Sequence, residues 1–227
     1  MSDPAEVGAT RVAIHEACLR MVADGLVIGS SGNISVRLDE ARCVVTAAGV
    51  PYSALAAGDH PVVRLDDGSW DGPHRPTSEL ALHLGVLRAM PEVGAVVHTH
   101  SRYAAAFAVA RLDLPFICNE SIATRAERVL VTDYAAPGSV DLGEQALHAF
   151  CRQPGSRAVL LANHGVVAIA PGLDDAYVVA QSVEWTAEIC HLARTLMAAG
   201  ADEHVLDRAV QEAIGRNYGV EISRPEA

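Results

Sequence analysis

The chain has 227 residues, of which 50% are hydrophobic and 4% aromatic, and its formal net charge at pH 7 is −11. This length is enough to bury a core without disulfides or a structural metal, and it suits a single domain over residues 1–227. The acidic balance excludes a general nucleic-acid or anionic-membrane surface, because clusters of Lys and Arg hold phosphate groups on such surfaces.

The first half of the chain mixes helical and strand-like runs. Helical spacing of apolar residues predicts a helix from about Glu6 to Asp24. The runs LVIGSSGNISVRLD and CVVTAAG predict a hairpin, and PVVRLDDGSW predicts another strand that leads into a turn. A helix is expected in RPTSELALHLGVLRAMP, opening with Pro76, Thr77 and Ser78 and stopping at Pro91. The run GAVVHTHS then predicts a strand.

The second half continues the mixture. A helix is expected over 102–110, and LPFICNES and RVLVTDY are predicted as short strands. DLGEQALHAFCR predicts a helix, and SRAVLLANHGVVAIAP predicts two strands joined by a tight NHG turn. LDDAYVVAQSVEWTAEICHLARTLMAAG predicts a long helix with acidic residues at its start, and a short helix and NYGVEIS close the chain. This alternation predicts an α/β fold.

The cysteines and apolar runs bear on the compartment. The five cysteines are scattered without a CxxC pair, a pattern that fits a reducing cytosol better than a disulfide framework. The N-terminal MSDPAEVGATR has no apolar segment, and no apolar run approaches the length of a membrane span. We therefore expect a cytoplasmic protein without a membrane or nucleic-acid partner.

Three histidines are candidate metal ligands. His98 and His100 share one face of the predicted strand, because residues i and i+2 point the same way, and two such imidazoles can chelate a metal. They can equally be polar residues where a strand meets solvent. His164 also follows an apolar strand, and Gly165 after it lets another group approach closely. Three neutral imidazoles with an open position are typical of catalytic zinc, although His164 alone suits a hairpin turn.

Two further segments are candidate binding sites. In HRPTSEL, the hydroxyls of Thr77 and Ser78 at a helix start suit an anion, and Glu79 can act as a general base. A plain helix start with an acidic first turn would show the same residues. In SSGNIS, Gly32 and Asn33 can supply backbone and amide donors, or simply form a turn between strands.

The order of these segments gives a family resemblance. SGNIS, TAAGVPY, PTSEL, VVHTHS and ANHG together resemble the class II aldolase/adducin-like family, over nearly the whole chain. The resemblance implies a three-layer α/β/α fold around a largely antiparallel central sheet, assembled as a homotetramer with sites at subunit interfaces. It also implies a divalent metal ion, usually zinc, with manganese or cobalt as alternatives. The enzymes most similar are lyases of carbohydrate metabolism that cleave ketose 1-phosphates such as L-fuculose 1-phosphate.

The resemblance also implies roles for single residues. The family's metal ligands match four residues, His98, His100, His164 and Glu79, the last being also the catalytic base. The residues that cradle the substrate and its phosphate match Gly32, Asn33, Gly49, Thr77 and Ser78. Tyr218 matches a tyrosine that reaches the neighbouring subunit's site and protonates the aldehyde-side oxygen.

The implied reaction cleaves the ketose 1-phosphate into a ketone phosphate and an aldehyde through a metal-stabilised enediolate. No lysine occurs in the sequence, the Lys+Arg total of 17 being all arginine, and this composition excludes a Schiff-base aldolase.

Departures from the family keep two alternatives open. Ala48 replaces a hydroxyl residue before Gly49, which removes one phosphate hydrogen bond. Asn119 stands where the fuculose-phosphate enzymes carry a tyrosine, and Glu120 lies near a catalytic Glu of related dehydratases. A metal-dependent dehydratase or decarboxylase that uses Glu79 and Glu120 is therefore an alternative, although Glu120 can also be a solvated loop acid. A non-catalytic adducin-like binding protein is disfavoured because all three histidines are present. We expect His83 to pack or cap rather than to ligate.

Overall fold

The computed structural model of the protein describes residues 4–198 and 205–225. Seven strands within these residues form one sheet, in the spatial order β4-β3-β2-β1-β5-β9-β8, and all neighbouring pairs are antiparallel. Their bounds are Asn33–Arg37 (β1), Arg42–Val45 (β2), Val62–Arg64 (β3), Trp70–Asp71 (β4), Ala95–Thr99 (β5), Ala158–Leu161 (β8) and Gly165–Ala170 (β9). The short strands β6 (Leu114–Pro115) and β7 (Arg128–Val129) pair separately.

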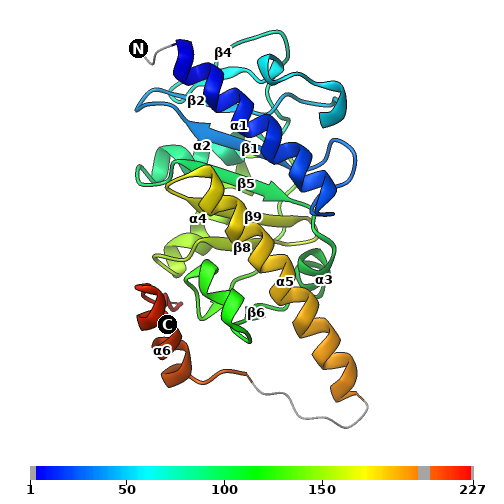
Figure 1. Cartoon of the computed structure of the whole chain (residues 1–227), viewed down its shortest axis with the longest axis vertical. Helices are drawn as coiled ribbons and strands as arrows, with labels where there is room; N and C mark the ends of the chain where they lie inside the picture. Colours follow the sequence, from blue (N-terminus) through cyan, green and yellow to red (C-terminus); the bar gives the residue numbers. More distant parts are fainter. Residues whose placement is uncertain (1–3, 199–204, 226–227) are drawn as a thin grey trace.

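Helices cover both faces of the sheet, so the α/β expectation with an antiparallel sheet is confirmed. Helices α1 (Pro4–Ala23) and α5 (Leu173–Met197) cross one face, and α3 (Arg102–Ala110) packs beside α5. Helices α2 (Leu80–Ala89) and α4 (Val140–Arg152) contact each other on the opposite face (Figure 1). Helix α6 (Arg208–Tyr218) lies against the 3₁₀ helix η3 (Asn119–Thr124).

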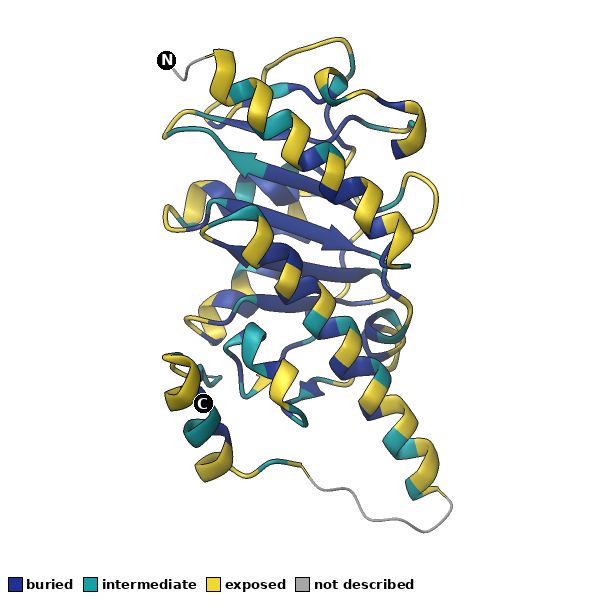
Figure 2. Ribbon diagram, in the orientation of Figure 1, coloured by how far each residue is buried: buried dark blue, intermediate teal, exposed yellow. Residues whose placement is uncertain are grey.

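Side chains of the central strands alternate between two apolar cores. Val97 of β5 packs with residues of α1 and α5, and its neighbour Val96 packs with residues of α2 and α4. Every residue of β5 is buried, and Figure 2 shows the central strands as the buried layer of the molecule. By the same alternation His98 faces the side of α2, and its cross-strand partner Asn33 shares that face. The sheet thus directs polar side chains at the ends of β1 and β5 towards α2.

Two local predictions were wrong. Helix α2 begins at Leu80 rather than at Pro76, because Pro76 bridges to Ala47 and the Thr77 amide donates to the Thr46 carbonyl, which keeps this segment extended. The segment ICNES is not a strand. Ser121 donates its amide to the Cys118 carbonyl, and the turn continues as η3.

Candidate functional site

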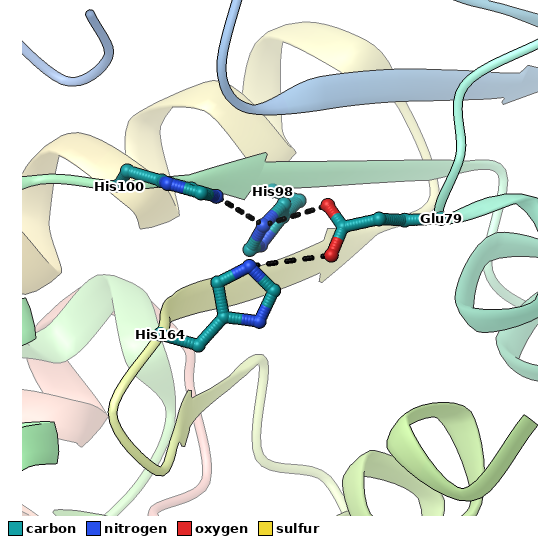
Figure 3. A group of neighbouring side chains, drawn as sticks. All are labelled: Glu79, His98, His100 and His164. Atoms are coloured by element: carbon teal, nitrogen blue, oxygen red, sulfur yellow. Dashed lines mark hydrogen bonds and ion pairs between the residues drawn. The ribbon is translucent and has the colours of Figure 1, made fainter. Parts of the chain in front are cut away.

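Four side chains from three separate segments meet at one end of the sheet (Figure 3). His98 ends β5, His100 follows it, His164 lies in the β8–β9 turn, and Glu79 is the N-cap residue of α2. One ligand atom from each lies within 4.8 Å of all the others. The Nε2 atoms of His98 and His100 are 2.9 Å apart. Glu79 Oε2 lies 3.1 Å from His98 Nε2, and Glu79 Oε1 lies 3.2 Å from His164 Nε2. The structure therefore brings together all four residues that the resemblance matched to metal ligands.

The donor atoms of this cluster suit a divalent metal ion. His98 donates its Nδ1–H to the Val166 carbonyl at 2.8 Å, so Nε2 is the ring nitrogen that faces the cluster and could ligate an ion. Glu79 Oε1 is buried without a hydrogen-bond partner among the described residues, as expected for an oxygen that serves a ligand or a substrate. Three imidazole nitrogens and one carboxylate are the donor types that zinc, manganese and cobalt accept.

Electrostatics favour the ligand-binding protonation state. Burial lowers the pKa of His100 to about 4, with His98 and His164 adding to the effect and Glu79 opposing it. Burial likewise lowers the pKa of His164. For Glu79, burial opposes ionisation, but the hydrogen bond and charge of His98, together with Asn33 and His164, outweigh it and hold the pKa well below its usual range. At neutral pH an ionised Glu79 thus faces neutral His100 and His164, the form in which these groups bind a cation.

Two glycines allow the backbone to close around His98. A Cβ on Gly165 would lie 2.1 Å from the Thr99 carbonyl oxygen and 3.3 Å from His98 Cε1. Gly32 has a φ of +71°, and a Cβ there would lie 2.5 Å from Val27 Cγ1 and 2.8 Å from the His98 carbonyl oxygen. The predicted close approach at Gly165 is confirmed, and both positions require glycine for steric reasons.

A pocket of about 410 Å³ opens beside the cluster. Its lining includes all five residues predicted to bind the substrate, Gly32, Asn33, Gly49, Thr77 and Ser78, together with Glu79, His100 and His164. Ala48 also lines the pocket, so the position where related enzymes carry a hydroxyl residue borders this pocket. Among the described residues that line it none is an arginine, so an anion there must be held by amides and hydroxyls. Asn163 also lines the pocket and was not predicted, because nothing in the sequence marks it beyond its place beside His164.

Glu120 and Tyr218 lie elsewhere in their own chain. Glu120 is an exposed residue of η3, and Tyr218, the last residue of α6, is 63% exposed. Neither is among the residues that line the pocket. A single chain does not bring these two side chains to the cluster, and their predicted catalytic roles stay predictions.

A row of buried, hydrogen-bonded side chains behind Glu79 was not predicted from the sequence. Asn33 Nδ2 donates to Glu79 Oε2 at 2.9 Å, and Asn33 Oδ1 lies 2.5 Å from His83 Nε2. His83 Nδ1 lies 2.7 Å from Ser35 Oγ. Burial lowers the pKa of His83 to about 3, with His98 adding to the effect and Glu79 opposing it, so the ring is neutral at pH 7. The available signals were the spacings of Asn33 with Ser35 and of Glu79 with His83.

Comparisons with known proteins agree with this site. Residues 12–191 match the family model of the class II aldolase and adducin N-terminal domain. The chain is 32% identical to a 5-deoxy-D-ribulose 1-phosphate aldolase of Bacillus thuringiensis serovar kurstaki, over 78% of this chain and 82% of that protein. It is also 32% identical to an L-fuculose phosphate aldolase of Haemophilus influenzae, over 75% and 77%. A solved L-fuculose 1-phosphate aldolase superposes with a TM-score of 0.85 at 27% identity, covering 93% of this chain and 96% of the other.

Proposed function

The chain belongs to the class II aldolase and adducin family, and from that premise we propose that it is a metal-dependent aldolase that cleaves a small ketose 1-phosphate into dihydroxyacetone phosphate and an aldehyde. The observation that carries this proposal is the cluster of Glu79, His98, His100 and His164 beside a pocket of hydroxyls and loop amides. Two relatives, each 32% identical, are named for the cleavage of phosphorylated sugars, which supports a sugar phosphate as the substrate class.

Residues of the pocket are assigned to the phosphate and the reacting carbons. The phosphate binds to Thr77, Ser78 and the loops at Gly32 and Gly49. These residues offer hydroxyl and amide donors, and no arginine is among the described residues that line the pocket. His98, His100, His164 and Glu79 would hold zinc, or else manganese or cobalt, and such an ion when bound supplies Lewis-acid stabilisation of negative charge on the substrate's oxygens.

Proton transfer completes the reaction. On cleavage the C3–C4 bond breaks, its electron pair becomes the C2–C3 double bond of an enediolate, and the π electrons of the C2 carbonyl move to its oxygen. The C4 hydroxyl loses its proton, and C3 then gains a proton as the C2 carbonyl re-forms. Glu79 exchanges the proton at C3, because Glu79 lines the pocket and its Oε1 is buried without a hydrogen-bond partner among the described residues. A Schiff base takes no part, since the sequence contains no lysine.

The remaining parts of the proposal concern the assembly. We assign the relay of the C4 hydroxyl proton to solvent to Tyr218 of a neighbouring copy in a homotetramer, its phenol giving its own proton to water as it takes the one from C4; Tyr218 is exposed and outside the pocket of its own chain. A dehydratase or decarboxylase would need Glu120 at the site, and since Glu120 is an exposed residue of η3 outside the pocket of its own chain, that alternative too would need Glu120 from a neighbouring copy. Among the described residues, no helix has the length and apolar character that crossing a membrane needs. A cytoplasmic location rests on the scattered cysteines.

One half-reaction tests this function without knowledge of the aldehyde. Every ketose 1-phosphate yields dihydroxyacetone phosphate, so the enzyme should exchange one C3 hydrogen of this compound with solvent deuterium, as followed by proton NMR. A chelator should abolish the exchange, and added zinc should restore it. Metal-loaded protein that exchanges no hydrogen of dihydroxyacetone phosphate and cleaves no ketose 1-phosphate would refute the proposal.

A further inference from the structure

A row of buried polar side chains connects Ser35 on β1 to the carboxylate of Glu79. Ser35 and His83 have no solvent exposure, and Asn33 and Glu79 are each 5% exposed. The row alternates between β1 and α2 in the order Ser35, His83, Asn33 and Glu79. This is possible because Asn33 and Ser35 share one face of the strand and His83 follows Glu79 by one helical turn. Such a row in an apolar core is costly unless every member has a partner, so its hydrogen-bond directions are strongly constrained.

The direction of each hydrogen bond follows from the carboxylate. Ionised Glu79 only accepts, so the atom of Asn33 that faces its Oε2 must be the Nδ2–H donor. Asn33 Oδ1 then faces His83 Nε2, and because an amide oxygen only accepts, the proton of the neutral ring must lie on Nε2. His83 Nδ1 is left with a lone pair, which accepts from the Ser35 hydroxyl. A single direction of donation, from Ser35 to Glu79, satisfies the whole row.

We propose that His83 is a positioning residue, held by Ser35 in the Nε2–H tautomer, which fixes the side-chain amide of Asn33 so that it donates to Glu79. The proposal rests on the proposed function for its catalytic consequence, and on the hydrogen bonds alone for its structural content. The opposite tautomer would place an unprotonated Nε2 against Asn33. The amide would then rotate by 180° to donate to the ring and would turn its oxygen towards the carboxylate, which repels it.

The two oxygens of Glu79 thereby receive different tasks. Oε2 accepts from Asn33 and faces His98 at 3.1 Å, so it is the anchored oxygen. Oε1 has no hydrogen-bond partner among the described residues and lies on the side of His164, so it is left for the proton of the substrate. His83 is not among the described residues that line the pocket, and its ring bonds to Ser35 and Asn33, so it positions the carboxylate through Asn33. A variant that frees the amide should therefore change turnover more than substrate binding.

Matched substitutions separate positioning from packing. His83→Gln keeps an N–H donor at the place of Nε2, whereas His83→Leu fills the site without a donor. Ser35→Ala removes only the hydroxyl that selects the tautomer, and it serves if His83→Leu fails to fold. His148→Leu, at an exposed histidine of α4, is the control. In the deuterium-exchange assay we expect His83→Leu to lower kcat 10- to 100-fold with KM within twofold, and His83→Gln to recover most of the loss. Ser35→Ala should lower kcat three- to tenfold.

NMR gives a readout that needs no activity. In protein labelled with ¹⁵N-histidine at pH 7.5, His83 should show a protonated Nε2 and an unprotonated Nδ1. The Asn33 side-chain amide should give a protected signal in the wild type and in His83→Gln, and lose it in His83→Leu. A protonated Nδ1 on His83, an Asn33 signal that persists in His83→Leu, or full kcat in folded His83→Leu would each overturn the proposal. A wild type that catalyses no exchange would refute the aldolase function, and the Asn33 signal would then decide the positioning role by itself.

Discussion

Replacement of Glu79 by glutamine tests whether this residue is the base. In Glu79→Gln the amide oxygen can still accept from Asn33 Nδ2, which lies 2.9 Å from Oε2, so the shape of the site and its anchor are retained. The basic oxygen on the side of His164, now 3.2 Å from its Nε2, becomes an NH₂ group. Loss of a positioned general base typically lowers the reaction rate 10²- to 10⁴-fold. We expect kcat to fall at least 100-fold, which corresponds to an activation free energy higher by about 2.7 kcal/mol.

The assay has two parts that must agree. Deuterium exchange into dihydroxyacetone phosphate reports the step assigned to Glu79, and aldehyde release from a set of ketose 1-phosphates reports the whole reaction. Metal content is measured on the same samples, and Glu92→Gln, at an exposed acid outside the pocket, is the matched control. A folded, metal-containing Glu79→Gln with wild-type exchange would refute the reasoning and would move the base elsewhere, with Glu120 the first residue to test.

Three further outcomes are expected. His100→Ala should lose most of its bound metal while staying folded, and a full metal complement by elemental analysis would contradict the ligand assignment. Ala48→Ser should lower the KM for a ketose 1-phosphate about fivefold, because one added hydrogen bond is worth about 1 kcal/mol; an unchanged or higher KM would indicate a substrate without phosphate there. The pKa values of His60 and His83 are lowered to about 4 and about 3, chiefly by burial, so the unfolded chain binds more protons than the folded one below about pH 6.5. The free energy of unfolding should therefore fall between pH 7 and pH 5, by on the order of 2 kcal/mol for each residue, and urea denaturation with equal midpoints at both pH values would contradict this.

The part of the site that depends on local strand periodicity could be predicted from the sequence. The two-residue spacing of His98 and His100 predicts one face of a strand, and the structure places their Nε2 atoms 2.9 Å apart. No spacing relates His164 or Glu79 to that pair, because they lie on other segments. Only the order of the family's motifs connected all four residues. The fold was likewise predictable as a mixture of elements, while the order of its strands depends on pairings between distant segments.

The errors have a tertiary cause. Pro76 and Thr77 look like a helix start, yet they pair with Ala47 and Thr46, which directly follow β2, and the chain turns into α2 only after Thr77. The buried row of side chains behind Glu79 could not be predicted from the sequence for the same reason. Strand period places Asn33 and Ser35 on one face, and helix period places Glu79 near His83. That the two pairs face each other depends on how α2 packs on the sheet.

The proposed metal site and the proposed phosphate pocket are coupled electrostatically. In the protein alone, Glu79 presents an ionised carboxylate to the pocket, and His100 and His164 beside it are neutral at neutral pH. The pocket that shares Glu79, His100 and His164 with the cluster has no arginine among its described lining residues, and the whole chain is acidic. A phosphorylated substrate would be repelled by such a site. A divalent cation held by this carboxylate and three neutral imidazoles would give the cluster a net charge of about +1, which would make the same pocket attractive to a phosphate without an arginine among its described lining residues. The histidines, the carboxylate and the hydroxyl-lined pocket would therefore act as one electrostatic unit, through which a chain without lysine would bind the proposed sugar phosphate.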